Sequence, residues 1–83
     1  MTTRTLIRAT AYVDTRDPHG VGWAYRLAYD DGHREMGRMD IGPTADRDIV
    51  LDELRALVGN DWWSGQWYCT DKAGLSYTWM RDA

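Results

Sequence analysis

Two short polar segments of this chain combine side chains that could bind a metal ion. Residues 14–19 contain two carboxylates and a histidine, and residues 30–35 contain three carboxylates and a histidine. Carboxylate and imidazole groups are common ligands of divalent metals. Their spacing here matches no calcium or zinc motif, and turns held by short polar side chains use the same residue types. We therefore expect two solvated turns and no bound cofactor.

Nucleophilic chemistry has one sulfur candidate, the single cysteine Cys69. One cysteine excludes an internal disulfide and a cysteine-based zinc site. No histidine lies near it in the sequence, and Lys72 is the nearby cation that could activate the thiol. We expect Cys69 to be a half-buried, inert thiol in a strand.

Tryptophan offers a different chemistry, the apolar anchoring of a partner. Four of the five tryptophans lie between residues 62 and 79, and Trp62 and Trp63 are adjacent in a segment without helix or strand period. Adjacent side chains cannot both enter one small core, so we expect at least one of these indoles to face outward. An exposed indole is a common anchor in protein interfaces. The alternative is that the pair caps the end of a helix in the core.

Composition limits the classes of function. The 83 residues fit one small domain, residues 1–83, with 43% hydrophobic and 28% charged residues. The net charge of −3 argues against a nucleic-acid-binding surface, which needs clustered Lys and Arg. No apolar run approaches the roughly 20 residues that span a bilayer, and the start of the chain lacks the apolar region of a signal peptide. We expect a cytoplasmic protein.

Period-two alternation predicts three strands in the first half of the chain, at residues 5–13, 21–29 and 33–41. Residues 14–20 carry turn signals, and Asp30-Asp31-Gly32 is a hairpin signature. Short connections between three such strands predict an antiparallel meander. The third strand is the most polar, so we expect it near an edge of the sheet.

A helix and two more strands follow. Pro43 should end the third strand, Thr44 is the expected N-cap, and Gly59 is a suitable residue to end the helix. Residues 67–70 and 75–80 read as strands around a turn with a glycine at its end. Alanine-rich faces of the first two strands should let the helix approach closely. The apolar residues that form one helix stripe are Val50, Leu51, Leu54, Leu57 and Val58.

The predicted fold class is therefore α+β, in the order β-β-β-α-β-β. It is an antiparallel meander sheet with one helix packed on one face. Because a single helix covers a single face, we expect the other face, which bears Arg8 and Tyr12, to be open. In so small a domain, a second copy or a target protein could close it.

Three short stretches resemble the ribonuclease H-like superfamily. A strand Ala11-Tyr12-Val13-Asp14 leads through Gly20-Val21-Gly22-Trp23 into a second strand. The predicted helix contains Glu53-Leu54-Arg55-Ala56-Leu57, and a later strand ends in Tyr68-Cys69-Thr70-Asp71. The order of elements is also similar to that of HicB-type antitoxins, which act by binding.

The ribonuclease H-like resemblance implies a metal-dependent nuclease. Asp14, Glu53 and Asp71 would then hold two Mg²⁺ ions at a scissile phosphate, and Asp48 fits a ligand position near the helix start. The sequence shows no basic groove for a nucleic-acid substrate, which favours binding over catalysis.

We therefore expect a non-catalytic protein-binding module that docks on a larger protein, with a homodimer as a further possibility. Its size and acidity match those of phage-borne inhibitors such as anti-CRISPR proteins, and of antitoxins. The metal-dependent nuclease is the alternative. The residues expected to bind the partner are Trp62, Trp63, Tyr12 and Arg8.

Overall fold

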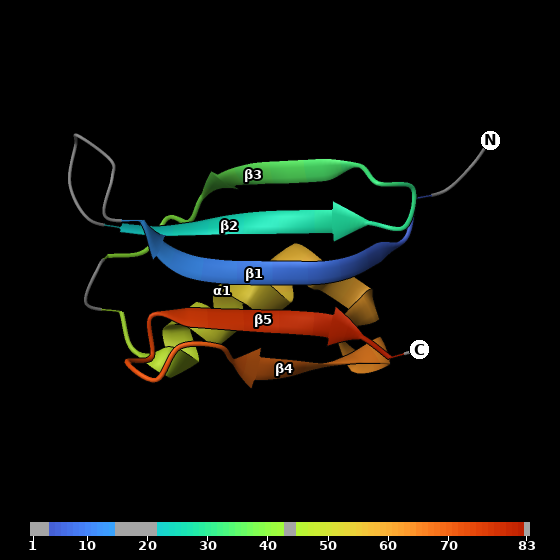
Figure 1. Ribbon diagram of the computed structural model, residues 1–83. Helices are drawn as coiled ribbons and strands as arrows, with labels where there is room; N and C mark the ends of the chain where they lie inside the picture. The colour runs from blue at the N-terminus through green and yellow to red at the C-terminus, as the bar shows by residue number, and fades with distance from the viewer. Residues whose placement is uncertain (1–3, 15–21, 43–44, 83) are drawn as a thin grey trace.

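The fold is a single five-stranded antiparallel sheet with one helix across one face (Figure 1). The computed structural model describes residues 4–14, 22–42 and 45–82. In sheet order the strands are β3-β2-β1-β5-β4. The predicted α+β class and the order β-β-β-α-β-β are thus confirmed. The elements are β1 (Leu6–Asp14), β2 (Gly22–Tyr29), β3 (Arg34–Arg38), α1 (Arg47–Val58), a 3₁₀ helix η1 (Gly59–Ser64), β4 (Gly65–Cys69) and β5 (Ser76–Arg81).

The chain places its first strand at the centre of the sheet. Strands β1 to β3 form the predicted meander, and the β4–β5 hairpin then adds to the other side of β1 through β5. The β2–β3 and β4–β5 turns contain the predicted glycines. Gly32 and Gly74 have φ of 87° and 74°, a backbone conformation that favours glycine. The connection at residues 15–21 lies outside the described residues.

The core lies between α1 and the near face of the sheet. Val50 and Leu54 of α1 and Trp79 of β5 are its largest fully buried side chains. Ala9 and Ala11 of β1 are also fully buried, and their small size lets the helix pack closely over the central strand. The stripe predicted for the helix therefore faces the sheet.

The expectation for the second strand was wrong. The alanines of β2, Ala24 and Ala28, pair with Tyr12 and Arg8 of β1 on the face away from α1. Trp23 of β2 instead enters the core. The helix approaches the middle of β1, where the core-facing side chains of Ala9 and Ala11 are small, and larger side chains fill the wider space over β2.

The helix begins later than predicted. Asp46 is its N-cap, and the Asp46 carboxylate accepts a hydrogen bond from the Ile49 backbone N–H at 3.1 Å. The predicted cap, Thr44, lies outside the described residues. Gly59 ends α1 as expected, with φ of 75°, and its backbone N–H donates to the Arg55 carbonyl.

The segment around Trp62 and Trp63, in which the sequence shows no helix or strand period, forms the 3₁₀ helix η1 at residues 59–64. Within the described residues, no helix is long and apolar enough to cross a membrane.

Candidate binding face

The face of the sheet opposite α1 is covered by none of the described elements; Figure 1 looks onto it, with the helix behind. Side chains alternate between the two faces of a strand, so strand pairing tells which residues share this open face. They form three rows across the sheet. The first row is Gln66, Met80, Arg8, Ala28 and Arg34. The second is Tyr68, Thr78, Thr10, Arg26 and Met36. The third is Thr70, Ser76, Tyr12, Ala24 and Arg38.

A hollow of about 530 Å³ lies mainly over the first two rows, and Thr70 of the third row also lines it. Ala28 forms part of its floor, and the longer side chains of Arg8 and Arg34 stand on the neighbouring strands on either side. Met36 and Met80 border it and are 66% and 47% exposed. The hollow thus combines guanidinium groups with flexible apolar rims, and three threonine hydroxyls also line it.

The arginines of this hollow differ from most others in the described chain. Arg4, Arg81 and Arg47 each contact an aspartate, with N···O distances of 2.8, 2.7 and 3.8 Å. Within the described residues, Arg8 and Arg34 have no carboxylate partner. The guanidinium groups of Arg8 and Arg34 are therefore available to bind an anionic group of another molecule.

The rest of the face is nearly free of carboxylates. Arg26 lies over the ring of Tyr12, with 5.0 Å between the guanidinium carbon and the ring centroid. Among the described strand positions of this face, the one carboxylate is Asp14, at the far end of β1 from Arg8. Arg8 and Asp14 are six positions apart along β1, which is about 20 Å at the usual rise per residue.

The sequence missed this arginine group. It predicted Arg8 and Tyr12 on the open face, which the pairing of β1 confirms. It found no basic groove, because Arg8, Arg26 and Arg34 are spread along three strands and form no run in the chain. The sequence did contain one signal: Arg34 and Met36 are two positions apart in a strand and therefore share a face. Only the strand pairing, however, brings them beside Arg26 and Ala28 of β2.

The two adjacent tryptophans lie away from this face and differ from each other. Trp62 is half-buried: its ring stacks on Trp79 with centroids 6.4 Å apart, and its carbonyl accepts a hydrogen bond from Trp79 Nε1 at 3.0 Å. Trp63 is 78% exposed, and the Arg55 guanidinium lies 5.0 Å from its ring centroid. One indole therefore faces outward, as expected, and the other closes the core. The four predicted binding residues do not form one surface.

The carboxylates of the nuclease hypothesis are spread over the fold. Asp14 ends β1, Asp48 lies exposed in the first turn of α1, Glu53 is in the middle of α1, and Asp71 is in the β4–β5 turn. The Asp71 carboxylate accepts a hydrogen bond from the Ala73 backbone at 3.2 Å. Residues 4–14, 22–42 and 45–82 include no group of three or more His, Cys, Asp or Glu side chains that could hold a metal.

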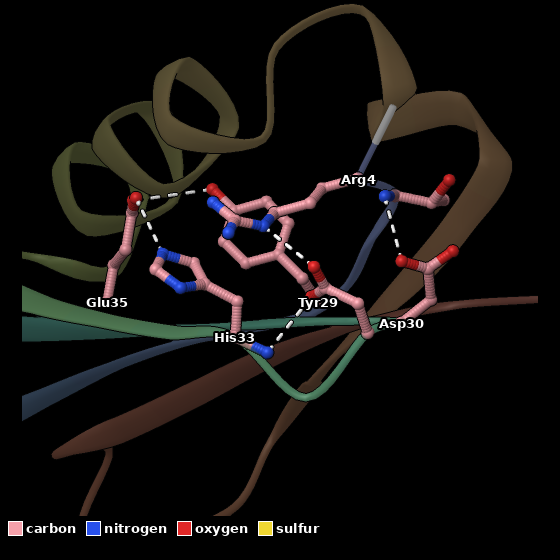
Figure 2. Close-up of polar contacts among 7 residues, drawn as sticks. Arg4, Tyr29, Asp30, His33 and Glu35 are labelled. Atoms are coloured by element: carbon pink, nitrogen blue, oxygen red, sulfur yellow. Dashed lines mark hydrogen bonds and ion pairs between the residues drawn. The ribbon is translucent and has the colours of Figure 1, made fainter. Parts of the chain in front are cut away.

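The polar residues of the β2–β3 hairpin hold the turn together (Figure 2). Asp31 accepts a hydrogen bond from the His33 backbone at 3.0 Å and another from Arg4 Nε at 2.8 Å. These two donors lower the pKa of the Asp31 carboxyl, the arginine contributing most. Asp30 accepts from the Thr5 backbone at 3.1 Å. The aspartates thus fasten the hairpin to the chain that enters β1.

Glu35 completes this group from β3. One of its oxygens accepts a hydrogen bond from the Tyr29 hydroxyl at 3.3 Å, and the other lies 3.2 Å from His33 Nε2 (Figure 2). Partial burial, followed by the charge of Glu35, raises the pKa of Tyr29. The Glu35 carboxylate is therefore engaged on the helix side of the sheet, since Glu35 pairs with Leu27 of the core.

Cys69 differs from its expected place. It is exposed at the end of the edge strand β4 instead of half-buried, and its thiol donates to the Asp71 carbonyl at 3.0 Å. Edge strands are paired on one side only, so their side chains have fewer neighbours to cover them.

No known protein family, no curated protein and no solved structure matches this chain. The resemblance to the ribonuclease H-like superfamily stays a prediction.

Proposed function

We propose that this chain is a non-catalytic protein-binding module that docks the open face of its sheet on a larger partner. One observation carries the proposal: none of the described elements covers that face, and its hollow has exposed methionines beside arginines without a carboxylate partner among the described residues. Methionine and arginine are both enriched in protein interfaces. Methionine adapts to irregular apolar surfaces, and arginine supplies directional hydrogen bonds.

A protein partner fits this face better than a nucleic acid. No aromatic ring lines the hollow, whereas single-stranded nucleic acid is usually held by stacking its bases on aromatic side chains. Acidic residues also outnumber basic ones by 13 to 10 in the whole chain. A long polyanion that extended beyond the arginines would therefore meet repulsion.

Blocking a partner's surface would be enough for an inhibitor or an antitoxin, and we place this protein in that class of cytoplasmic binding proteins. A second copy of the chain is the competing occupant of the open face. Sedimentation of the purified protein over a range of concentrations separates the two, because self-association through this face would be lost in variants of its methionines.

The central test removes the apolar rim of the hollow. Met36 and Met80 are replaced together by serine, and tagged protein is used to capture partners from a bacterial lysate. The control is Ile49→Ser on α1, because Ile49 is also a large hydrophobic side chain, 46% exposed, on the other layer of the fold.

We expect the double variant to lose a protein that the wild type and the Ile49 variant both retain. We expect the affinity to fall about tenfold or more, because the interface would no longer bury the apolar area of two methionine side chains. Equal capture by all three proteins would show that the open face is not the docking surface. Thermal unfolding of each variant checks that the fold is intact, which we expect because all three side chains are exposed.

A further inference from the structure

We propose that Arg8 and Arg34, on either side of Ala28, form a clamp for carboxylates of an acidic segment of the partner protein. This inference rests on the docking face proposed above and names the chemistry that the face recognises. It concerns two arginines on different strands, with a small residue between them.

The geometry of the sheet sets the size of this clamp. Arg8 pairs with Ala28, and Ala28 pairs with Arg34, so the three residues form a line across three strands. Adjacent strands are about 4.8 Å apart, which places the two arginine backbones roughly 10 Å from each other. Two long side chains can converge from that distance over the alanine. The planar guanidinium group binds a carboxylate through two parallel hydrogen bonds.

The charges around the clamp select an anion from outside. Neither arginine has a carboxylate partner within the described residues, although Arg4 and Arg81 do. Glu35, next to Arg34 in the sequence, also lines the hollow, but its carboxylate contacts Tyr29 and His33 on the helix side of the sheet. Two neighbouring cations without counterions repel each other, and a bound carboxylate would remove that repulsion.

The rims of the hollow favour a protein carboxylate over a phosphate. Met80 is in the same row as Arg8, and Met36 is next to Arg34 along the edge of the face. A partner that buries these thioethers must offer apolar side chains beside its charges. An acidic protein segment with interspersed apolar residues has this character, whereas a nucleic-acid backbone has charge without apolar side chains.

The experiment uses two labelled peptides and one oligonucleotide with the full chain. The first peptide contains glutamate and leucine, and the second has glutamine in place of every glutamate. An oligothymidylate with the same number of charges as the acidic peptide is the third probe. Fluorescence anisotropy is measured for the wild type, for Arg8→Gln and Arg34→Gln singly and together, and for Arg47→Gln. The last variant removes the same charge as either single clamp variant, but from α1, behind the sheet.

We expect the wild type and the Arg47 variant to bind the acidic peptide alike. Each clamp substitution should weaken binding about tenfold, since hydrogen bonds to a charged group are lost. The glutamine peptide should bind weakly to the wild type and to every variant, and added salt should weaken binding of the acidic peptide. The double variant should unfold at the wild-type temperature or above it, because Arg8 and Arg34 have no carboxylate partner among residues 4–14, 22–42 and 45–82.

Three results would overturn the clamp. One is equal binding of the glutamate and glutamine peptides by the wild type. Another is an equal loss of affinity in a single clamp variant and in the Arg47 variant, which would indicate a general charge effect. The third is tighter binding of oligothymidylate than of the acidic peptide, lost in the clamp variant, which would make this a nucleic-acid site. If the methionine variants still abolish capture while the clamp variant does not, the docking face stands and only the clamp is wrong.

Discussion

Replacing Ala28 by glutamate should place a carboxylate inside the arginine clamp. Ala28 is half-buried between Arg8 and Arg34 and borders the hollow, so a longer side chain has room on that face. The new carboxylate would be directly cross-strand from both guanidinium groups. The substitution would therefore occupy the site that we assign to a partner.

The expected gain in stability follows from two cross-strand ion pairs. Opposite charges that face each other across strands contribute roughly 0.2–1 kcal/mol per pair. Solvent screening of exposed arginines favours the lower half of that range, so we expect about 0.5–1 kcal/mol in total. In a domain of this size, 1 kcal/mol raises the unfolding temperature by about 4–8 °C.

The assay is thermal unfolding followed by tryptophan fluorescence, with Ala28→Gln as the uncharged control. The glutamate variant should unfold at a higher temperature than the glutamine variant, and the difference should shrink at high salt. It should also fail to bind the acidic peptide. An unfolding temperature at or below that of the glutamine variant would falsify the claim that Arg8 and Arg34 converge over this position.

Further predictions concern other parts of the fold. Trp62→Ala should destabilise the protein by about 2–4 kcal/mol because a ring packed on the core is lost, whereas Trp63→Ala should cost about 0.5 kcal/mol, both measured by urea unfolding. Gly65→Ala should lower stability by more than about 1 kcal/mol in the same assay, since the added methyl would overlap a core indole and the backbone of β5. The pKa of Asp31 is lowered in the folded state by Arg4, so its contribution is present above the ordinary carboxyl pKa and is lost as the pH falls below about 4. Asp31→Asn should therefore flatten the acid side of the stability profile, and an unchanged acid side in thermal melts from pH 6 to about pH 3 would contradict this.

Local patterns were enough to predict the elements of this fold. In strand β2 the residues Trp23, Tyr25, Leu27 and Tyr29 recur at every second position, and β3 follows a turn that needs Gly32 at positive φ. The helix has a single apolar stripe, with Val50 and Leu54 at its buried centre. These signals are contained in a few neighbouring residues, so the sequence alone specifies them.

The ends of the helices and strands, and the face of the sheet on which each side chain lies, were predicted less well because they depend on contacts between elements. The helix starts after Asp46, and its end continues into η1, where Trp62 packs on the core. At the start of β1, pairing with β2 shifts register between Leu6 and Arg8. Leu6 therefore enters the core and Ile7 is exposed, although simple alternation puts them the other way round.

The sequence by itself determined that this chain forms a small acidic α+β domain with one helix and an open sheet face. Only the tertiary structure decided that the face would carry an arginine pair with no carboxylate partner in the part of the chain that is described, because Arg8, Ala28 and Arg34 belong to three strands. Their alignment depends on the register of two strand pairings. Such pairings join residues far apart in the chain, and no pattern within one segment encodes which partners will meet.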